Sequence, residues 1–251
     1  MSLDEKILNV ATVLGQVEQT YTPATFANSF GAEDVVMTDL IARHAPGIEI
    51  FTLDTGRLPE ATHTLMRDLA DRYELPIRIF YPDATELEAF VAAHGPNAFF
   101  DSVELRKACC GARKVSPLRR ALAGKRAWIT GLRREQSPTR TAIPVSEFDD
   151  EHGLQKFNPL FDWTRKEVWS YIRDHDLPYN ALHDTGFASI GCAPCTRAIT
   201  VGEDERAGRW WWEDPESKEC GLHTGRTPTE RARPRGVAAK TNPSEIEKVI
   251  S

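Results

Sequence analysis

The sequence predicts an α/β fold built on a mostly parallel, doubly wound sheet. Short segments rich in β-branched and aromatic residues alternate with segments of helical periodicity along most of the chain. Small and polar residues follow three of the predicted strands, as they do where parallel strands turn into helices. No internal repeat interrupts this order, and 41% hydrophobic residues in a chain of 251 supply a full core.

The individual elements follow from periodicity and from the residues that start and stop helices. The expected strands cover residues 24–29, 49–53, 77–81, 127–130 and 157–160. The expected helices cover residues 7–19, 35–43, 60–73, the segment that follows 83–86, 118–123 and 168–174. Capping-box spacing marks helix starts at Asp83 and Thr164, and Ser116-Pro117 is expected to supply an N-cap and an N1 proline.

Three loops at strand ends are the expected ligand cleft. They cover residues 29–34, 53–56 and 131–140. Ligands of doubly wound sheets bind beyond the carboxyl ends of the strands, so these loops should converge. Backbone N–H groups at such turns bind anions, with help from the helix dipole. The alternative is that they are ordinary strand-to-helix turns.

Composition excludes several classes of protein. The net charge of −6 argues against a general nucleic-acid binder, which is usually basic. Residues 1–15 lack the basic and apolar regions of a signal peptide, and no apolar run is long enough for a membrane span. We therefore expect a cytoplasmic protein without nucleic-acid or membrane partners, whose cysteines are reduced, metal-binding or catalytic. Whether it forms a homo-oligomer is left open.

The five cysteines divide into four and one. Cys109 and Cys110 are adjacent, and Cys192 and Cys195 form a Cys-Ala-Pro-Cys hairpin. Four thiolates suit zinc or an iron–sulfur cluster, but an adjacent pair is awkward for zinc because neighbouring side chains diverge. The alternatives are unrelated buried thiols, a structural zinc site, or a thioredoxin-type dithiol, which would leave the adjacent pair unexplained.

The remaining cysteine, Cys220, lies in a polar segment. Lys218 precedes it, and His223 follows three residues later. A nearby cation lowers the pKa of a thiol and makes it more reactive, so Cys220 is a candidate nucleophile. The alternative is an incidental exposed cysteine.

Basic residues gather near the predicted cleft. They are Lys114, Arg133, Arg134, Arg140, Arg206 and Arg209. Several cations near strand ends suit a compact dianion, although solvated surface charge is the common alternative. The triplet Trp210-Trp211-Trp212 is expected to serve as core and cover rather than as a nucleotide stack.

Taken together, these stretches resemble the assimilatory adenylyl-sulfate (APS) and phosphoadenylyl-sulfate (PAPS) reductases. The resemblance extends from Phe26 to His223. The motifs that carry it are Cys109-Cys110 with Cys192-Ala193-Pro194-Cys195, Glu219-Cys220-Gly221-Leu222-His223, Asn158-Pro159-Leu160 with Trp163-Thr164, Pro178-Tyr179-Asn180 with Leu182-His183, and Ser189-Ile190-Gly191. The implied fold is the Rossmann-like adenine-nucleotide α-hydrolase fold, in agreement with the pattern of strands and helices.

The resemblance also implies a cofactor and a substrate. It implies a [4Fe–4S] cluster on Cys109, Cys110, Cys192 and Cys195, with Cys220 as the nucleophile. Family members that keep these four cysteines generally use adenylyl sulfate, so this substrate is expected, with PAPS as the alternative. Ser217-Lys218-Glu219-Cys220 departs from the frequent Lys-Arg-Glu-Cys and leaves one cation fewer beside the thiol.

The mechanism that the resemblance implies begins with a thiolate attack on sulfur. The nucleotide is expected across Ser29, Phe30, Gly31, Asp34, Leu53, Asp54, Thr55, Gly56 and Gly131. The phosphosulfate is expected on Lys114, Arg140, Arg206 and Arg209. Cys220 would attack the sulfur and expel AMP, with His223 orienting the thiol. Thioredoxin or a glutaredoxin-like protein would then release sulfite.

Two further readings stay open. An ATP-dependent adenylating or thiolating enzyme of the same fold would carry Ser-Gly-Gly-x-Asp-Ser in its first loop, from which residues 29–34 depart. A zinc-stapled, nucleotide-sensing module would be non-enzymatic. We expect residues 1–200 to form the nucleotide- and cluster-binding domain. Residues 201–251 would form a mobile C-terminal segment that carries Cys220 and ends in a disordered tail.

Overall fold

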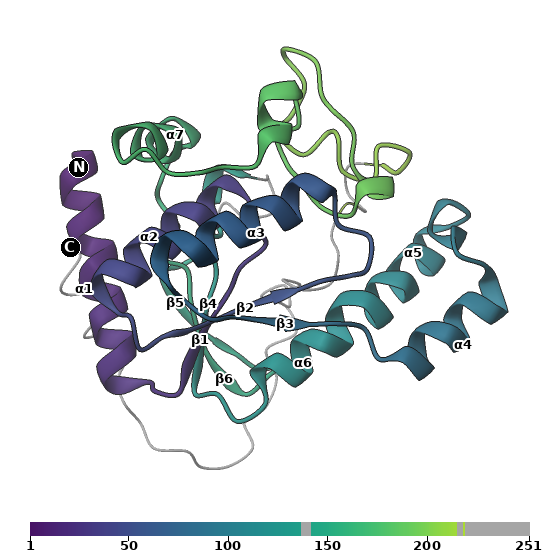
Figure 1. Ribbon diagram of the computed structural model, residues 1–251, viewed down its shortest axis with the longest axis horizontal. Helices are drawn as coiled ribbons and strands as arrows, with labels where there is room; N and C mark the ends of the chain where they lie inside the picture. Colours follow the sequence, from purple (N-terminus) through teal and green to yellow (C-terminus); the bar gives the residue numbers. More distant parts are fainter. Residues whose placement is uncertain (137–141, 215–217, 219–251) are drawn as a thin grey trace.

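The sheet of the computed structural model has six strands, of which five run parallel (Figure 1). The structure describes residues 1–136, 142–214 and 218. The spatial order is β3-β2-β1-β4-β6-β5, and only β5 is antiparallel to its neighbour. The strands are β1 Ala24–Ala27, β2 Glu49–Leu53, β3 Ile77–Phe80, β4 Ala127–Ile129, β5 Ser146–Asp149 and β6 Leu154–Phe157.

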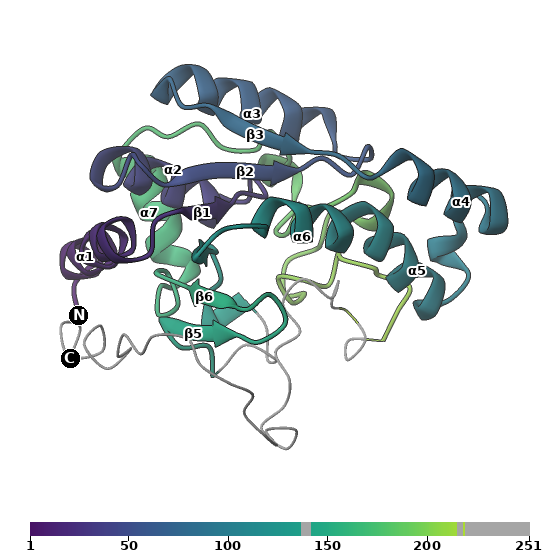
Figure 2. The same ribbon diagram turned by 90° about the horizontal axis from the view of Figure 1, so that it is seen from below.

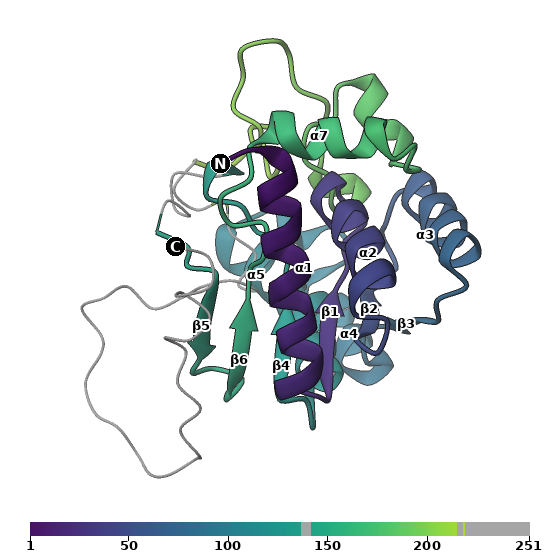
Figure 3. The same ribbon diagram turned by 90° about the vertical axis from the view of Figure 1, so that its left-hand side faces the viewer.

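Helices cover both faces of this sheet. They are α1 Leu3–Thr20, α2 Ala32–His44, α3 Glu60–Tyr73, α4 Ala84–His94, α5 Val103–Cys110, α6 Ser116–Leu122 and α7 Arg165–Asp174. Helices α1 and α2 lie in front of the strands in Figure 3, and α4 and α5 lie behind them. The predicted doubly wound α/β architecture is therefore confirmed.

Alternation along the strands divides the core between the two faces. Phe26 and Ile50 point into the larger core under α1, α2, α3 and α7. Phe51 and Trp128, one residue out of phase with that set, pack with Leu118 of α6 on the opposite face. This period of two is the pattern of strands buried on both sides, and it fixes which strand residues face each helical layer.

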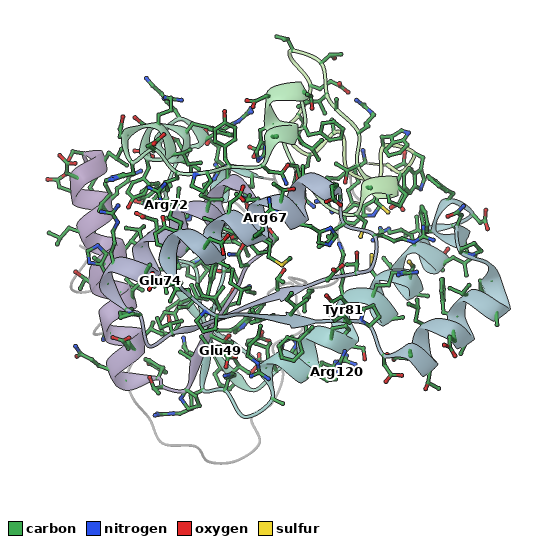
Figure 4. All side chains as sticks on the ribbon, in the orientation of Figure 1. Glu49, Arg67, Arg72, Glu74, Tyr81 and Arg120 are labelled. Carbon is green, nitrogen blue, oxygen red and sulfur yellow. The ribbon has the colours of Figure 1, made fainter. Side chains whose placement is uncertain are left out.

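Buried polar groups tie the helices of the larger face together. The buried carboxylate of Asp39 on α2 accepts hydrogen bonds from Tyr73 (2.7 Å) and Tyr171 (2.6 Å). Arg72 at the end of α3 donates to the carbonyls of residues 175 and 176 after α7. On the other face, Arg120 donates to the carbonyl of Tyr81 after β3; Figure 4 labels both residues, and Arg72 as well.

The structure corrects several details of the sequence prediction, and it adds helix α5, which the sequence analysis did not expect. The strand expected over 157–160 ends at Phe157, because residues 158–163 form hydrogen-bonded turns. Strand β5 was not predicted; it pairs with β6 as an edge hairpin, visible at one end of the sheet in Figure 2. Ser116 is not an N-cap, because α5 continues through a π-helical turn over Gly111–Val115 directly into α6. The predicted caps at Asp83 and Thr164 are confirmed.

Candidate active site

A cavity of about 220 Å³ lies at the carboxyl ends of the strands. The loops after β1, β2 and β4 line it, as expected for a doubly wound sheet. Residues 188–191 and 205–210 close it from the other side. Predicted site residues that line it are Ser29, Gly31, Asp34, Leu53, Thr55, Lys114, Gly131, Arg206 and Arg209.

Three predicted nucleotide-site residues do not line this cavity. Phe30 is 1% exposed and belongs to the larger core, with its backbone at a positive φ of 61°. Asp54 turns its carboxylate toward the backbone N–H of Gly56 (2.8 Å) and the ring of His63 (3.0 Å). Asp54 and Gly56 therefore shape the loop after β2, while Leu53 and Thr55 face the ligand space.

Asp34 organises the loop after β1. Its carboxylate accepts hydrogen bonds from both the backbone N–H and the hydroxyl of Ser29, each at 2.6 Å. Burial raises the pKa of this carboxyl to about 7, although the Ser29 hydrogen bonds oppose the rise. Gly131 lies against the same carboxylate, and a Cβ atom there would collide with it. The loops after β1 and β4 are therefore fitted together around Asp34.

Cations line the cavity, and the charges of Lys114 and Arg209 act on Cys192. Arg209 donates to the carbonyl of Ile190 (3.1 Å), and its guanidinium packs over the ring of Trp210 at 4.8 Å. Gly191 leaves room for this guanidinium, because any Cβ at that position would overlap it. Arg206 donates to the backbone carbonyl of Lys218 (3.1 Å).

All four predicted ligand cysteines line one small second cavity. Its volume is about 20 Å³, and Arg57, Phe99, Arg106, Arg113, Lys114 and Trp210 complete its lining. Cys109 and Cys110 are the last two residues of α5. Cys192 and Cys195 belong to a hairpin about 80 residues later in the sequence. The two predicted pairs of cysteines therefore come together. Lys114 and Trp210 line both cavities and form the wall between them.

The thiols differ in their electrostatic environment. Burial raises the pKa of Cys195 to about 12, with help from the neighbouring Cys192. Burial would also raise the pKa of Cys192, but the charge of Lys114 and the hydroxyl of Thr55 outweigh it, so the pKa lies below its usual value. The Thr55 hydroxyl lies 3.2 Å from the Cys192 sulfur. This contact links the loop after β2 to the cysteine hairpin.

The small cavity suits a group that accepts hydrogen bonds and binds thiolates. Two buried N–H groups on its lining residues, Nε1 of Trp210 and Nε of Arg113, have no hydrogen-bond partner in the described chain. Cations around it would offset the charge of four thiolates. No three His, Cys, Asp or Glu side chains among residues 1–136, 142–214 and 218 are grouped tightly enough to hold a single metal ion. Four thiols with cations beside them form a donor set that fits an iron–sulfur cluster.

Three predicted site residues lie outside the part of the chain that the structure describes. They are Arg140, Cys220 and His223. The described chain comes within two residues of Cys220 at Lys218, beside Arg206. The structure also adds wall residues that were not named as site residues: His183 and Glu205, and Glu33 from within the predicted loop 29–34. Their positions depend on tertiary contacts, which local sequence does not reveal.

A buried ion pair anchors the segment that follows the cavity. Arg106 on α5 is 0% exposed and makes two hydrogen bonds with the carboxylate of Glu213, at 2.8 and 2.7 Å. Its guanidinium also lies 4.5 Å from the ring centroid of Trp210. Residues 210–213 are thereby held against the helix that carries Cys109 and Cys110. Among the described residues, no helix is both long enough and apolar enough to cross a membrane.

Comparison with known proteins agrees with this arrangement. The sequence model of one protein family, the phosphoadenosine phosphosulfate reductase domain, matches residues 23–198. Adenosine 5′-phosphosulfate reductase of Allochromatium vinosum is 54% identical over 84% of this chain and 82% of its own length. The enzyme of the same name from Neisseria meningitidis serogroup B is 50% identical over 88% of this chain and 91% of its own.

Solved structures support the same fold. The phosphate complex of phosphoadenylyl-sulfate reductase from Candida auris has a TM-score of 0.63 and 29% identity, over 79% of this chain and 91% of that one. Yeast FAD synthetase, at 16% identity and a TM-score of 0.54 over 78% of this chain and 67% of its own, shares the fold alone. These similarities confirm the predicted Rossmann-like adenine-nucleotide fold. The chain belongs to the phosphoadenosine phosphosulfate reductase family.

Proposed function

We propose that the protein reduces adenylyl sulfate to sulfite and AMP in sulfate assimilation and cysteine biosynthesis. One observation carries the proposal: a cavity at the nucleotide-binding edge of the sheet shares a wall, Lys114 and Trp210, with a cavity lined by four cysteines. Relatives of about 50% identity that bear the name adenosine 5′-phosphosulfate reductase support the choice of substrate. The proposed location is the cytoplasm.

In the proposed first step, the phosphosulfate lies against Lys114, Arg206 and Arg209. Cationic groups there stabilise the charge of the sulfate and of the departing phosphate. The Cys220 thiolate attacks the sulfate sulfur, an S–S bond forms, and the S–O bond breaks. AMP leaves with the electron pair of that bond, and Cys220 becomes an S-sulfocysteine.

In the second step, a dithiol protein such as thioredoxin completes the reduction. One of its thiolates attacks the sulfur of Cys220, and sulfite departs with the electrons of the broken S–S bond. Its second thiol resolves the mixed disulfide, so the two electrons come from the partner. His223 would orient the Cys220 thiol, and Arg140 would add a cation to the phosphosulfate site.

We assign Cys109, Cys110, Cys192 and Cys195 as the residues that would hold a [4Fe–4S] cluster. When bound, the cluster would supply rigidity and fixed charge beside Lys114. We also propose a division of labour along the chain. Residues 1–200 would form the nucleotide- and cluster-binding unit, and residues 201–251 the segment that carries Cys220. The described part of that segment is anchored through Glu213 and Glu205.

The direct test is sulfite release from adenylyl sulfate with thioredoxin, compared with the 3′-phosphorylated nucleotide. We expect sulfite from adenylyl sulfate and less from PAPS; equal or preferred use of PAPS would favour the alternative activity. Cys220→Ser should form no sulfonated protein while it retains iron and binds AMP. A Cys220→Ser protein that still forms a labelled adduct at the normal rate would contradict the assigned nucleophile.

A further inference from the structure

The lining of the large cavity carries both signs of charge. Lys114, Arg206 and Arg209 lie on its lining, and Lys114 also borders the cysteines. The carboxylates of Glu33 and Glu205 belong to the same lining but come from different parts of the chain, the start of α2 and the segment after residue 200. A ligand in this cavity therefore meets both signs of charge.

Arg133 holds the acidic wall together. Its side chain is fully buried, and its Nε donates to Glu33 at 2.7 Å. The same guanidinium pairs with Glu205 at 3.2 Å and with Glu135 at 3.1 Å. One arginine thus fixes carboxylates from the α2 start, the loop after β4 and the segment after residue 200.

The cluster of carboxylates around Arg133 carries an excess of negative charge. Arg165 acts on Glu205 as a second cation, so three carboxylates face two guanidinium groups. Burial raises the pKa of Glu205, and the charge of Glu33 adds to this rise while Arg133 opposes it. The cost of burying a carboxylate beside another carboxylate indicates a wall that resists further negative charge.

This lining gives a nucleotide sulfate a direction, because Lys114 borders the cysteines whereas Glu33 and Glu205 do not. With the phosphosulfate at Lys114, beside the cysteines, the nucleoside extends away from that wall toward the remaining lining, which includes the carboxylates. We propose that Glu205, supported by Glu33, is a specificity-determining residue that disfavours nucleotides with an additional ribose phosphate and so selects adenylyl sulfate over its 3′-phosphorylated form. This inference rests on the proposed function for the orientation of the ligand.

Glu205 is the member of the pair best suited to a test. Glu33 lies at the start of α2, and its Cβ would lie 3.1 Å from a Cβ added at Gly131, so replacing it would disturb two loops. Glu205 lies outside helices and strands, and Arg133 keeps Glu33 and Glu135 as partners if Glu205 loses its charge. Glu205→Gln therefore removes one charge from the wall with little change in shape.

The experiment measures binding of AMP and of adenosine 3′,5′-bisphosphate to the full chain by titration calorimetry. We expect the wild type to prefer AMP, and Glu205→Gln to reduce this preference roughly tenfold, as removal of one nearby charge predicts. Glu205→Asp should keep the preference. Glu203→Gln is the matched control, because Glu203 pairs with Arg197 in the same segment and does not line the cavity.

The proposal is overturned if Glu205→Gln folds and binds AMP with an unchanged preference, or if Glu203→Gln shifts it equally. If Glu205→Gln does not fold, the wild type decides: salt should weaken its preference for AMP, because screening reduces repulsion. A preference that salt leaves unchanged overturns the proposal. Neither binding measurement requires turnover, so the two proposals can fail separately. If the variants bind as expected but the wild type releases no sulfite from adenylyl sulfate, the proposed function is refuted and the role of Glu205 in binding is not.

Discussion

The two cavities share a wall but are built in different ways. Loops at the carboxyl ends of β1, β2 and β4 form the larger one, and its principal buried carboxylate, Asp34, has protein partners for its charge. The smaller one lies between the end of α5 and a cysteine hairpin, and four thiols line it.

Under the proposed function, protein loops alone form the larger cavity, whereas the smaller cavity is the place for the cofactor. None of the described cysteines lines the larger cavity, so nucleotide binding should survive changes at Cys109, Cys110, Cys192 and Cys195. The smaller cavity brings together four thiols and several cations, and the proposed cluster would link the four thiols there. Lys114 is the described cation common to both linings, so the cavities should affect each other mainly through it.

The largest effect should come from breaking the small cavity. Cys192→Ser should lose its iron and its sulfite release, because Cys192 is the thiol with the lowered pKa and contacts Thr55. AMP binding should change less than about threefold, since no cysteine of the described chain lines the larger cavity. Iron analysis, sulfite release and titration calorimetry give the three readouts. A variant that loses AMP binding in parallel with iron would show that the cavities are not separable.

The next effect belongs to the larger cavity and depends on pH. The pKa of Asp34 is about 7 in the folded protein, above the 3.8 of an ordinary aspartate. The folded state therefore binds this proton more tightly, so the stabilisation present at low pH is lost as pH rises toward 7. Relative to Asp34→Asn, the free energy of unfolding of the wild type should fall by up to roughly 4 kcal/mol between pH 4 and 7. Denaturant titrations at several pH values measure this difference; parallel pH profiles would contradict it.

A smaller effect should follow from crowding the junction of two nucleotide loops. Gly131→Ala would place a Cβ against the Asp34 carboxylate, which must move. We expect AMP binding to weaken by about 2 kcal/mol, roughly thirtyfold, while iron content stays normal. Gly15→Ala is the control, because a Cβ there meets no atom within 4 Å. Normal AMP affinity in Gly131→Ala would show that the Asp34 loop is not part of the nucleotide site.

The smallest effect tests the link between the cavities. Thr55→Val removes the hydroxyl that lies 3.2 Å from the Cys192 sulfur and should raise the pKa of that thiol. We expect iron loss to a chelator to accelerate about fivefold, equivalent to ~1 kcal/mol for one hydrogen bond. Thr55→Ser keeps the hydroxyl and should behave as the wild type. Equal rates in all three proteins would show that this contact does not hold the cysteine hairpin.

Much of the fold was predictable because most strands and helices show a clear local periodicity of apolar residues. The four strands β1 to β4 and the main helices have strong apolar patterns, and the caps at Asp83 and Thr164 are local features. Strand β5 was missed because Ser146–Asp149 is a half-exposed edge strand with little apolar alternation. The helix start predicted at Ser116-Pro117 was wrong, because a proline also fits inside a helix directly after a π-helical turn.

The candidate site was predictable where residue type alone determines chemistry. Cysteines that bind metal and cations that bind phosphate are recognisable in sequence, and the structure brings Cys109, Cys110, Cys192 and Cys195 to one cavity. Glu33 lies in the loop 29–34 that was predicted to be part of the cleft, whereas Glu205 was not predictable, because its place in the lining depends on a tertiary contact with Arg133. Phe30 was assigned to the ligand on loop position, whereas its side chain serves the core.

The π-helical turn over Gly111–Val115 sets the rotational phase of everything that follows it. Each residue of an α-helix advances the side chains by about 100°, so the wider turn changes the angular relation between the cysteine pair and α6. Lys114 reaches the partition between the cavities, while Leu118 and Leu122 still face the sheet. A π-helical turn holds one residue more than an α-helical turn, so deleting one residue there would leave a continuous α-helix with α5 and α6 still in phase, and would change only which side chain lies at the partition.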